Sequence, residues 1–144
     1  MIHAVSLKVT RLLFNSVIKP HGITMQEWRI ILFIAYEQPT TAAELSAETG
    51  MQESHVSTNL VRLTGNGLIQ RVASKTDGRV RELSLADKGQ RLFGLISPEI
   101  NRFGRSLWED LNESGRDGFR NTLRLMDDRL EELLMQNSEE QQAV

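Results

Sequence analysis

The residues of this sequence whose chemistry stands out are basic side chains gathered between positions 54 and 81. That segment has five basic residues and one acidic residue, although the whole chain has a net charge of −2 and residues 109–144 hold ten acidic residues against four arginines. Guanidinium and ammonium groups grouped in this way are typical of surfaces that bind phosphate, so the segment indicates a polyanionic partner. The basic residues are Arg62, Arg71, Lys75, Arg79 and Arg81, and the acidic residue is Asp77.

The residue types that carry most enzyme and metal chemistry are missing or scattered. The sequence has no cysteine, which excludes disulfides, thiolate metal sites and thiol redox sensing. His3, His21 and His55 lie far apart, without the HxxxH or HxxE spacing of a metal site. There is no nucleophile elbow, phosphate-binding glycine loop or acid–base pair. We therefore expect no enzyme activity, no metal and no cofactor.

A helix predicted over residues 55–67 presents small hydroxyl groups opposite its apolar stripe. Val56, Leu60 and Leu63 fall within about 60° of one another on a helical wheel and mark the buried side. The other side is either a solvated face or a surface that reads DNA, because base edges and phosphates accept arginine, hydroxyl and methyl groups. The basic residues nearby favour DNA. The residues on this side and its flanks are Ser54, His55, Ser57, Thr58, Val61 and Arg62.

A short helix before it completes a helix-turn-helix. Its start is capped by Thr40 or Thr41, with Glu44 placed as in a capping box, and Gly50 is expected to end it. Residues 51–54 form the turn to the second helix. The apolar residues available to hold the two helices together are Ala43, Leu45, Val56, Leu60 and Leu63.

Two short runs of alternating residues, 68–74 and 79–85, flank an Asp-Gly turn and predict a β-hairpin. A hairpin directly after a helix-turn-helix makes residues 41–85 a winged helix-turn-helix. In that motif the second helix enters the major groove, and the wing reaches the flanking backbone or the minor groove.

The basic residues of the hairpin have distinct expected roles. Asp77 is placed to pair with Arg79 and hold it extended toward a narrow minor groove, with Lys75 and Arg81 on phosphates. Arg71, at the base of the wing, is expected to contact a phosphate or form a surface salt bridge. The alternative is that the strand arginines are simply solvated.

Amphipathic helices flank the winged segment. In the first 21 residues, Ile2, Val5, Val9 and Leu12 have helical spacing, and residues 19–22 end the helix. Thr24 can cap a second helix that ends at Gln38-Pro39. Its apolar residues at helical spacing are Trp28, Ile31, Leu32 and Ala35.

After Leu85 the sequence predicts a long helical region with a kink or local break at Pro98. A turn at residues 112–115 precedes a last helix with a heptad seam, which would stay exposed unless a second copy covers it. The residues of this seam are Phe119, Leu123, Met126, Leu130 and Leu133. The polar end, 138–144, is expected to fray.

The segment from residue 67 to residue 89 resembles the wing signature of the multiple-antibiotic-resistance regulator (MarR) family. The matching residues are Gly67-Leu68-Ile69, Arg71, Asp77-Gly78-Arg79 and Leu85-Ala86-Asp87-Lys88-Gly89. Upstream, residues 40–63 are similar to the family's helix-turn-helix, with Val56-Ser57, Arg62 and Leu63 in place, and the resemblance extends over essentially the whole chain. Ala86 replaces the usual capping Thr, and Thr58, Val61 and Gly65-Asn66 depart from the family pattern on or beside the reading helix, which leaves the operator sequence open.

The resemblance implies a homodimer, a pseudo-palindromic operator with half-sites roughly 10 base pairs apart, and often a small aromatic or phenolic ligand. The candidate DNA contacts are Thr41, Ser54, His55, Ser57, Thr58, Val61, Arg62, Arg71, Lys75, Asp77, Arg79 and Arg81. The candidate ligand contacts are Arg11, Asn15, His21 and Trp28, with the alternative that Trp28 is a core residue and Arg11 a surface one. The candidate dimer interface is Val5, Val9, Leu12, Phe119, Leu123, Met126, Leu130 and Leu133.

The sequence thus predicts a mainly α (α+β) protein, a winged helix-turn-helix with N- and C-terminal helices forming a dimerisation region. We expect a single domain, 1–144, with four parts. Residues 1–37 form N-terminal helices for dimerisation and the ligand cleft, and residues 38–86 form the winged helix-turn-helix. Residues 87–137 form the C-terminal dimerisation helices, and residues 138–144 form a polar tail. We expect a cytoplasmic repressor of transcription, because no signal peptide is recognisable and the longest apolar run, 30–36, is too short to span a membrane. The alternatives are an activator of the same fold, or a protein-interaction module that binds no DNA.

Overall fold

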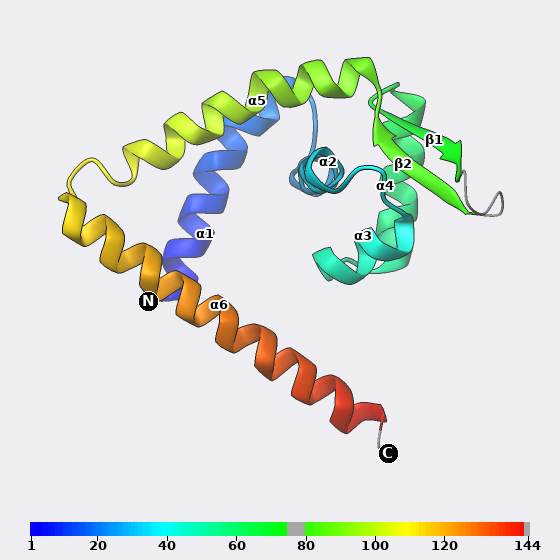
Figure 1. The fold of residues 1–144 in the computed structure, drawn as a ribbon. Helices are drawn as coiled ribbons and strands as arrows, with labels where there is room; N and C mark the ends of the chain where they lie inside the picture. The colour runs from blue at the N-terminus through cyan, green and yellow to red at the C-terminus, as the bar shows by residue number, and fades with distance from the viewer. Residues whose placement is uncertain (75–79, 143–144) are drawn as a thin grey trace. The chain divides into compact units, whose positions relative to one another are not determined.

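A computed structural model describes residues 1–74 and 80–142 (Figure 1). The chain divides into two compact units, Met1–Phe103 and Gly104–Val144. The described part is mainly helical with one two-stranded antiparallel sheet, which confirms the predicted fold class. The elements are α1 Ile2–Leu13, a π-helical turn Phe14–Ile18, a 3₁₀ turn Lys19–His21, α2 Met25–Glu37, α3 Ala42–Thr49, α4 Glu53–Gly65, β1 Ile69–Ala73, β2 Arg81–Leu85, α5 Asp87–Ser106 and α6 Glu113–Gln142.

The predicted helix boundaries in the first unit are largely confirmed, because they depend on local capping. The N-terminal helical stretch ends at Gly22, whose φ of 74° is in the left-handed region that glycine adopts without strain. Thr24 caps α2 through a complete capping box with Glu27, and Thr41 caps α3 in the same way with Glu44. Helix α4 begins at Glu53, slightly before the predicted start at residue 55.

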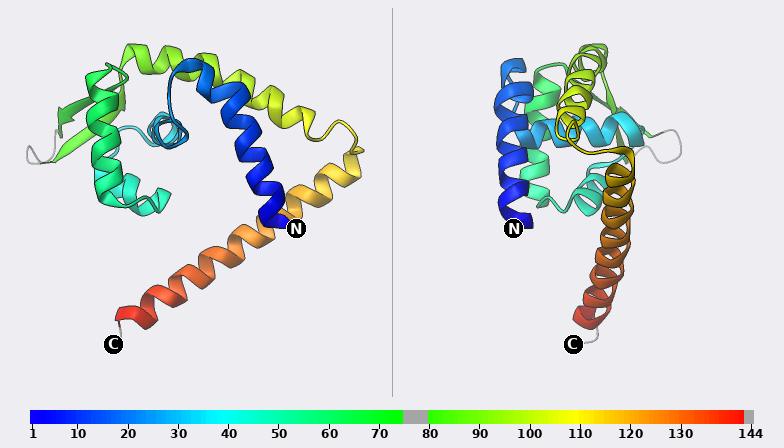
Figure 2. Two further views of the ribbon diagram at one scale, coloured as in Figure 1. Left: turned by 180° about the vertical axis from the view of Figure 1, so that it is seen from behind. Right: turned by 90° about the vertical axis from the view of Figure 1, so that its left-hand side faces the viewer.

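The core of the first unit surrounds α2, which contacts the π-helical turn, α3, α4 and β2 (Figure 2). Because α2 is covered on several sides, Ile30 and Ile34 are buried together with Trp28 and Ile31, whereas the predicted Leu32 and Ala35 are only partly buried. From the helix-turn-helix, the core receives Leu45, Val56, Leu60 and Leu63 as predicted. The prediction for Ala43 is wrong: this residue is exposed, because it lies on the outer side of α3.

The predicted hairpin forms, with strands β1 and β2 inside the predicted runs. Ile69 pairs with Leu85 and Arg71 with Leu83. On the other side of β2, Thr40 pairs with Leu83 as a neighbouring strand would. The Thr40 N–H donates to the Leu83 carbonyl at 3.2 Å, and the Thr40 carbonyl accepts the Leu83 N–H at 2.6 Å. This bridge attaches the hairpin to the segment between α2 and α3.

Helix α5 begins against the start of the hairpin. The Leu68 carbonyl accepts a hydrogen bond of 3.0 Å from the Ala86 N–H. A Cβ on Gly89 would lie 2.0 Å from that same carbonyl oxygen, so only glycine permits this approach. The helix then continues through Pro98 to Ser106, and the predicted alternative of a local break is therefore wrong.

The unit from Gly104 onward is dominated by α6. Asn112 caps this helix by accepting the Gly115 N–H at 2.8 Å, and Trp108 contacts Phe119 with ring centroids 4.8 Å apart. The helix runs to Gln142, beyond the predicted end at residue 137. Along the described part of the chain, no helix is long and apolar enough to cross a membrane.

Candidate nucleic-acid interface

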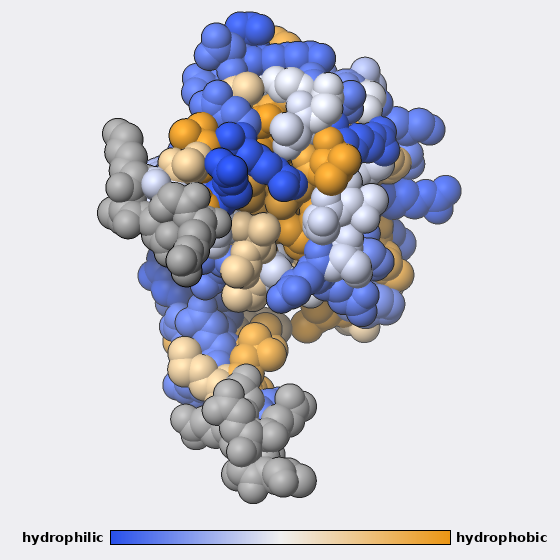
Figure 3. All heavy atoms as spheres, turned by 90° about the vertical axis from the view of Figure 1, so that its right-hand side faces the viewer, coloured by the Kyte–Doolittle hydropathy of each residue, from blue (hydrophilic) through white to orange (hydrophobic). Residues whose placement is uncertain are grey.

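Helix α4 presents the residues that the sequence assigns to a reading face. The side opposite its buried residues carries Ser54, Thr58 and Val61, and Val61 is 65% exposed although it is apolar. On the flanks, His55, Ser57 and Arg62 are exposed as well. No acidic residue occurs between Ser54 and Gly65, so the face has no carboxylate to repel a phosphate. Figure 3 shows that apolar residues are exposed among hydrophilic ones on this side of the molecule.

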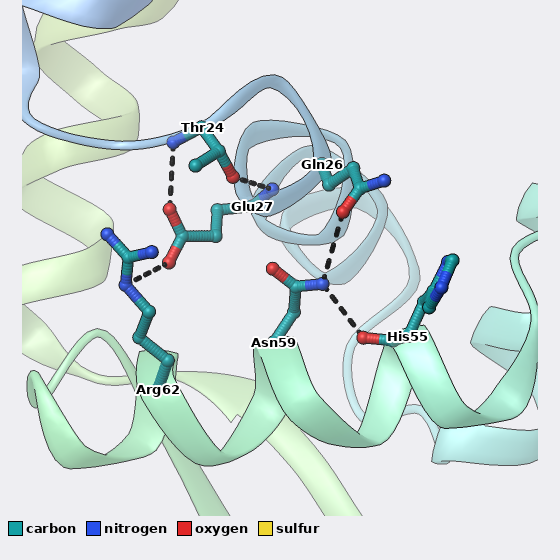
Figure 4. Close-up of polar contacts among 6 residues, drawn as sticks. All are labelled: Thr24, Gln26, Glu27, His55, Asn59 and Arg62. Atoms are coloured by element: carbon teal, nitrogen blue, oxygen red, sulfur yellow. Dashed lines mark hydrogen bonds and ion pairs between the residues drawn. The ribbon is translucent and has the colours of Figure 1, made fainter.

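The polar side chains on this helix are partly engaged within the protein. The Thr58 hydroxyl donates a 2.9 Å hydrogen bond to the Ser54 carbonyl, one turn earlier. The Asn59 amide donates to the His55 carbonyl at 2.8 Å and to the Gln26 side chain, on α2, at 3.5 Å (Figure 4). Side chains that bond to their own helix or to α2 are held in place before any ligand arrives.

Arg62 has a second role that its sequence context did not indicate. Its Nε lies 3.0 Å from Oε1 of Glu27, a carboxylate that is 1% exposed, while Arg62 is 56% exposed (Figure 4). The other Glu27 oxygen accepts the Thr24 N–H at 2.8 Å. Glu27 is therefore a site residue missed in the sequence, and the available signal was its position three residues after the capping Thr24.

At the start of α3, the hydroxyl of Thr41 is committed to the capping box. It accepts the Glu44 N–H at 3.2 Å and donates to the Glu44 carboxylate at 3.1 Å. Hydrogen bonds from the Thr41 N–H, and from the hydroxyls of Thr40 and Thr41, lower the pKa of Glu44. The capping carboxylate therefore stays ionised, and Thr41 reaches a ligand only with the part of its side chain that lies outside this cap.

The described part of the hairpin places two arginines on one face. Paired residues of an antiparallel ladder point to the same side, and Arg71 pairs with the buried Leu83 while Arg81 pairs with Ala73. Arg71 and Arg81 therefore lie on the same face of the hairpin as the buried Leu83, but both arginine side chains are exposed. Lys75, Asp77 and Arg79 lie outside the described residues.

The hairpin lies beside α4, which contacts β1 (Figure 2, left). On its opposite face, the Gln70 amide donates to the Ser84 hydroxyl at 3.0 Å, and Val72 pairs with Glu82. Glu82, the acidic residue of the described strands, is thus on the face away from Arg71 and Arg81. The structure consequently brings the α4 residues and these two arginines together in one region of the first unit.

The four candidate ligand residues are not gathered in one cavity. Trp28 is 3% exposed and stacks on Phe93 in the core, with centroids 5.9 Å apart. Arg11 and Asn15 are exposed near the end of α1, and Arg11 lines a shallow hollow with Phe14 and Met25. His21 lies 3.6 Å from Glu99.

His21 also lines a separate hollow of about 420 Å³ at the end of α4. Its wall combines basic side chains with apolar ones and includes Asn66 and Leu68, where α4 passes into the hairpin. A larger hollow of about 930 Å³ lies between α2 and α3, and its lining includes Tyr36, Glu37 and Glu48. The basic residues of the smaller hollow are His21, Lys88 and Arg91, and the apolar ones include Ile23, Leu92 and Leu95.

Comparisons with known proteins agree with this arrangement. Residues 21–80 match the model of the MarR family. The chain is 26% identical over 126 residues to an uncharacterised HTH-type transcriptional regulator of Staphylococcus aureus, covering 88% of this chain and 85% of that protein. It is also 26% identical over 94 residues to the homoprotocatechuate degradative operon repressor of Escherichia coli, covering 65% and 64%. Among solved structures, Staphylococcus aureus MarR in complex with salicylate and kanamycin superposes with a TM-score of 0.75 at 23% identity, covering 91% and 86%.

Proposed function

We propose that the chain is a member of the MarR family, whose model matches residues 21–80, and that it is a dimeric regulator that binds operator DNA. The observation that carries the proposal is the exposed side of α4, which has hydroxyl, methyl and basic groups and no carboxylate between Ser54 and Gly65, beside a hairpin that exposes Arg71 and Arg81 on one face. Hydroxyl and methyl groups suit base edges, and guanidinium groups suit phosphates.

In this proposal α4 lies in the major groove, and the hairpin follows the flanking backbone. Ser54, His55 and Ser57 contact phosphates or base edges from α4, and Thr41 does so from the start of α3. Arg71, Arg81 and Lys75 contact phosphates, while Arg79, oriented by Asp77, enters the minor groove. Arg62 contacts the backbone with the part of its guanidinium that Glu27 leaves available.

Regulation in this proposal is repression by a homodimer in the cytoplasm. The dimer forms through the apolar stripes of α1 and α6 and binds two half-sites roughly 10 base pairs apart. Similarity to an operon repressor of Escherichia coli supports repression over activation.

Release by a small aromatic or phenolic acid is the remaining part of the proposal. The hollow beside His21 supports it, because cationic groups next to apolar side chains suit a carboxylate on an apolar body. Because Asn66 and Leu68 line this hollow, a ligand there contacts the junction between α4 and the hairpin. Similarity to a structure solved with salicylate is consistent with such a ligand.

The salt dependence of binding tests the DNA proposal. Protection of a symmetric site from cleavage is expected, with log K falling linearly against log salt at a slope of about −5 to −9 for roughly six to ten phosphate contacts. Arg71→Gln combined with Arg81→Gln should reduce the steepness of that slope by about 2, because two phosphate contacts are lost. Arg29→Gln, which removes an exposed charge from α2, serves as the control and should leave the slope unchanged. Absence of any protected site at low salt would contradict DNA binding and favour a protein-interaction module.

A further inference from the structure

We infer that Thr58 and Val61 of α4 read thymine bases in the operator through the thymine 5-methyl group. The inference rests on the proposed DNA binding and adds the chemistry by which the helix selects bases. Thymine is the one base of DNA that carries an apolar group in the major groove, so an apolar contact there distinguishes it from the others.

The first observation is the state of the Thr58 hydroxyl. It donates to the Ser54 carbonyl at 2.9 Å, and this bond turns the hydroxyl back along the helix. The γ-methyl group is then the part of Thr58 offered to a partner. Donation from the hydroxyl to a base would require exchanging this internal hydrogen bond for an external one, whereas contact through the methyl group requires no change.

The second observation is the exposed apolar side chain of Val61. Residues three apart on a helix lie on the same side, so Val61 is a neighbour of Thr58, and it is 65% exposed. Both residues point away from Val56, Leu60 and Leu63, which are buried. At about 100° per residue, Thr58 and Val61 are about 60° apart and lie on either side of the line opposite the core. The methyl groups of the two side chains thus form one small apolar surface at the centre of the reading face.

The third observation is that α4 is held against rotation from one flank. Arg62 is tied to the buried carboxylate of Glu27, and Asn59 donates to Gln26, so two side chains on the same flank are anchored to α2 (Figure 4). A helix fixed in this way presents Thr58 and Val61 at a constant angle, as discrimination between bases requires.

Replacement of thymine by deoxyuridine tests the inference, because it removes only the methyl group and keeps base pairing. A bound duplex is first selected from random sequences, and each thymine of one half-site is then replaced in turn. The wild-type protein should bind about three- to fivefold more weakly at one or two positions, the effect of losing one buried methyl group. Replacement at the remaining thymines should change affinity little.

A matched pair of variants assigns the effect to the side chains. Thr58→Ser keeps the hydroxyl and removes the methyl group, so it should lose the preference for thymine over deoxyuridine at one position. Thr58→Val keeps the methyl group and removes the hydroxyl, so it should retain that preference. Val61→Ala should lose it at the neighbouring position. All three changes lie on an exposed face, and equal melting temperatures of the variants confirm that folding is unaffected.

The outcomes separate the two levels of the proposal. If no duplex is selected at any salt concentration, the proposed DNA binding fails, and the inference fails with it. If a duplex is bound but deoxyuridine has no effect anywhere, the inference alone is overturned. The inference is also overturned if Thr58→Ser retains the preference while Thr58→Val abolishes it, since the hydroxyl would then be the reading group.

Discussion

Glu27 is a buried carboxylate whose two oxygens bond to different parts of the first unit. One oxygen accepts the Thr24 N–H and completes the cap of α2, and the other faces Arg62 on α4. A buried charge is tolerated only when it is paired and hydrogen-bonded. Arg62 therefore serves the fold as well as the surface that the sequence assigned it to.

Arg62→Ala is expected to lower the free energy of unfolding by about 1–3 kcal/mol, because it leaves one oxygen of Glu27 buried without its partner. The loss should stay below the roughly 3–5 kcal/mol of a fully buried pair, since more than half of the Arg62 side chain is exposed. Urea denaturation measures the change through the transition midpoint. Arg29→Ala, an exposed arginine on α2, is the control and should change stability by at most about 0.5 kcal/mol.

If Arg62→Ala unfolds like the wild type but binds DNA more weakly, Arg62 acts on DNA alone. In that case the contact with Glu27 contributes no measurable stability. Loss of stability accompanied by weaker DNA binding would support both roles. Combining Arg62→Ala with Glu27→Gln should recover part of the stability, because the buried charge is then removed together with its partner.

At the scale of the elements, the hairpin is positioned by contacts from segments on both sides of it in the sequence. Thr40 bridges β2 through two backbone hydrogen bonds, and the Gln38 side chain accepts the Leu85 N–H at 3.0 Å. On the other side, the start of α5 lies against Leu68. Contacts with residues outside the hairpin therefore determine the orientation of the hairpin relative to α4.

Gly89→Ala tests the contact between α5 and the hairpin. The added Cβ would lie 2.0 Å from the Leu68 carbonyl oxygen, so α5 must move away and strain the Ala86 hydrogen bond. We expect a loss of about 3 kcal/mol in stability, measured by denaturation. Gly94→Ala in the same helix is a matched control, since nothing lies within 4 Å of its Cβ position, and it should stabilise by about 0.5–1 kcal/mol. Equal stabilities of the two variants would contradict the close approach.

The features that could be predicted from the sequence are those with local causes. The caps at Thr24 and Thr41, the stop at Gly22 and the hairpin depend on residues a few positions apart, and the structure has them as expected. The contacts of Glu27 with Arg62 and of Thr40 with Leu83 join residues far apart in the chain. No periodicity signals such a pair, so these parts of the candidate site could be found only in the folded protein.

At the scale of the whole molecule, apolar residues of α1 and α6 remain exposed in the single chain. On α1 these include Val5 and Leu12, and on α6 the heptad seam from Phe119 to Leu133 is exposed along its length. Soluble monomers rarely expose apolar surface over so many turns of helix. A second copy that covers these stripes is therefore the state in which the protein is expected to act, and two half-sites of an operator require the same state.

Leu130→Glu is expected to break this dimer. The seam position is apolar and exposed in the single chain, so a carboxylate there would be buried without a partner when two copies associate. A cost of about 3 kcal/mol corresponds to a dimer dissociation constant that is raised roughly a hundredfold. Sedimentation velocity over a range of concentrations measures it. Leu125→Glu introduces the same charge at another exposed leucine of α6, outside the seam, and should leave association unchanged. An unchanged dimer in Leu130→Glu would place the interface elsewhere, whereas a monomeric wild type would rule out a dimer as the form that binds a symmetric operator.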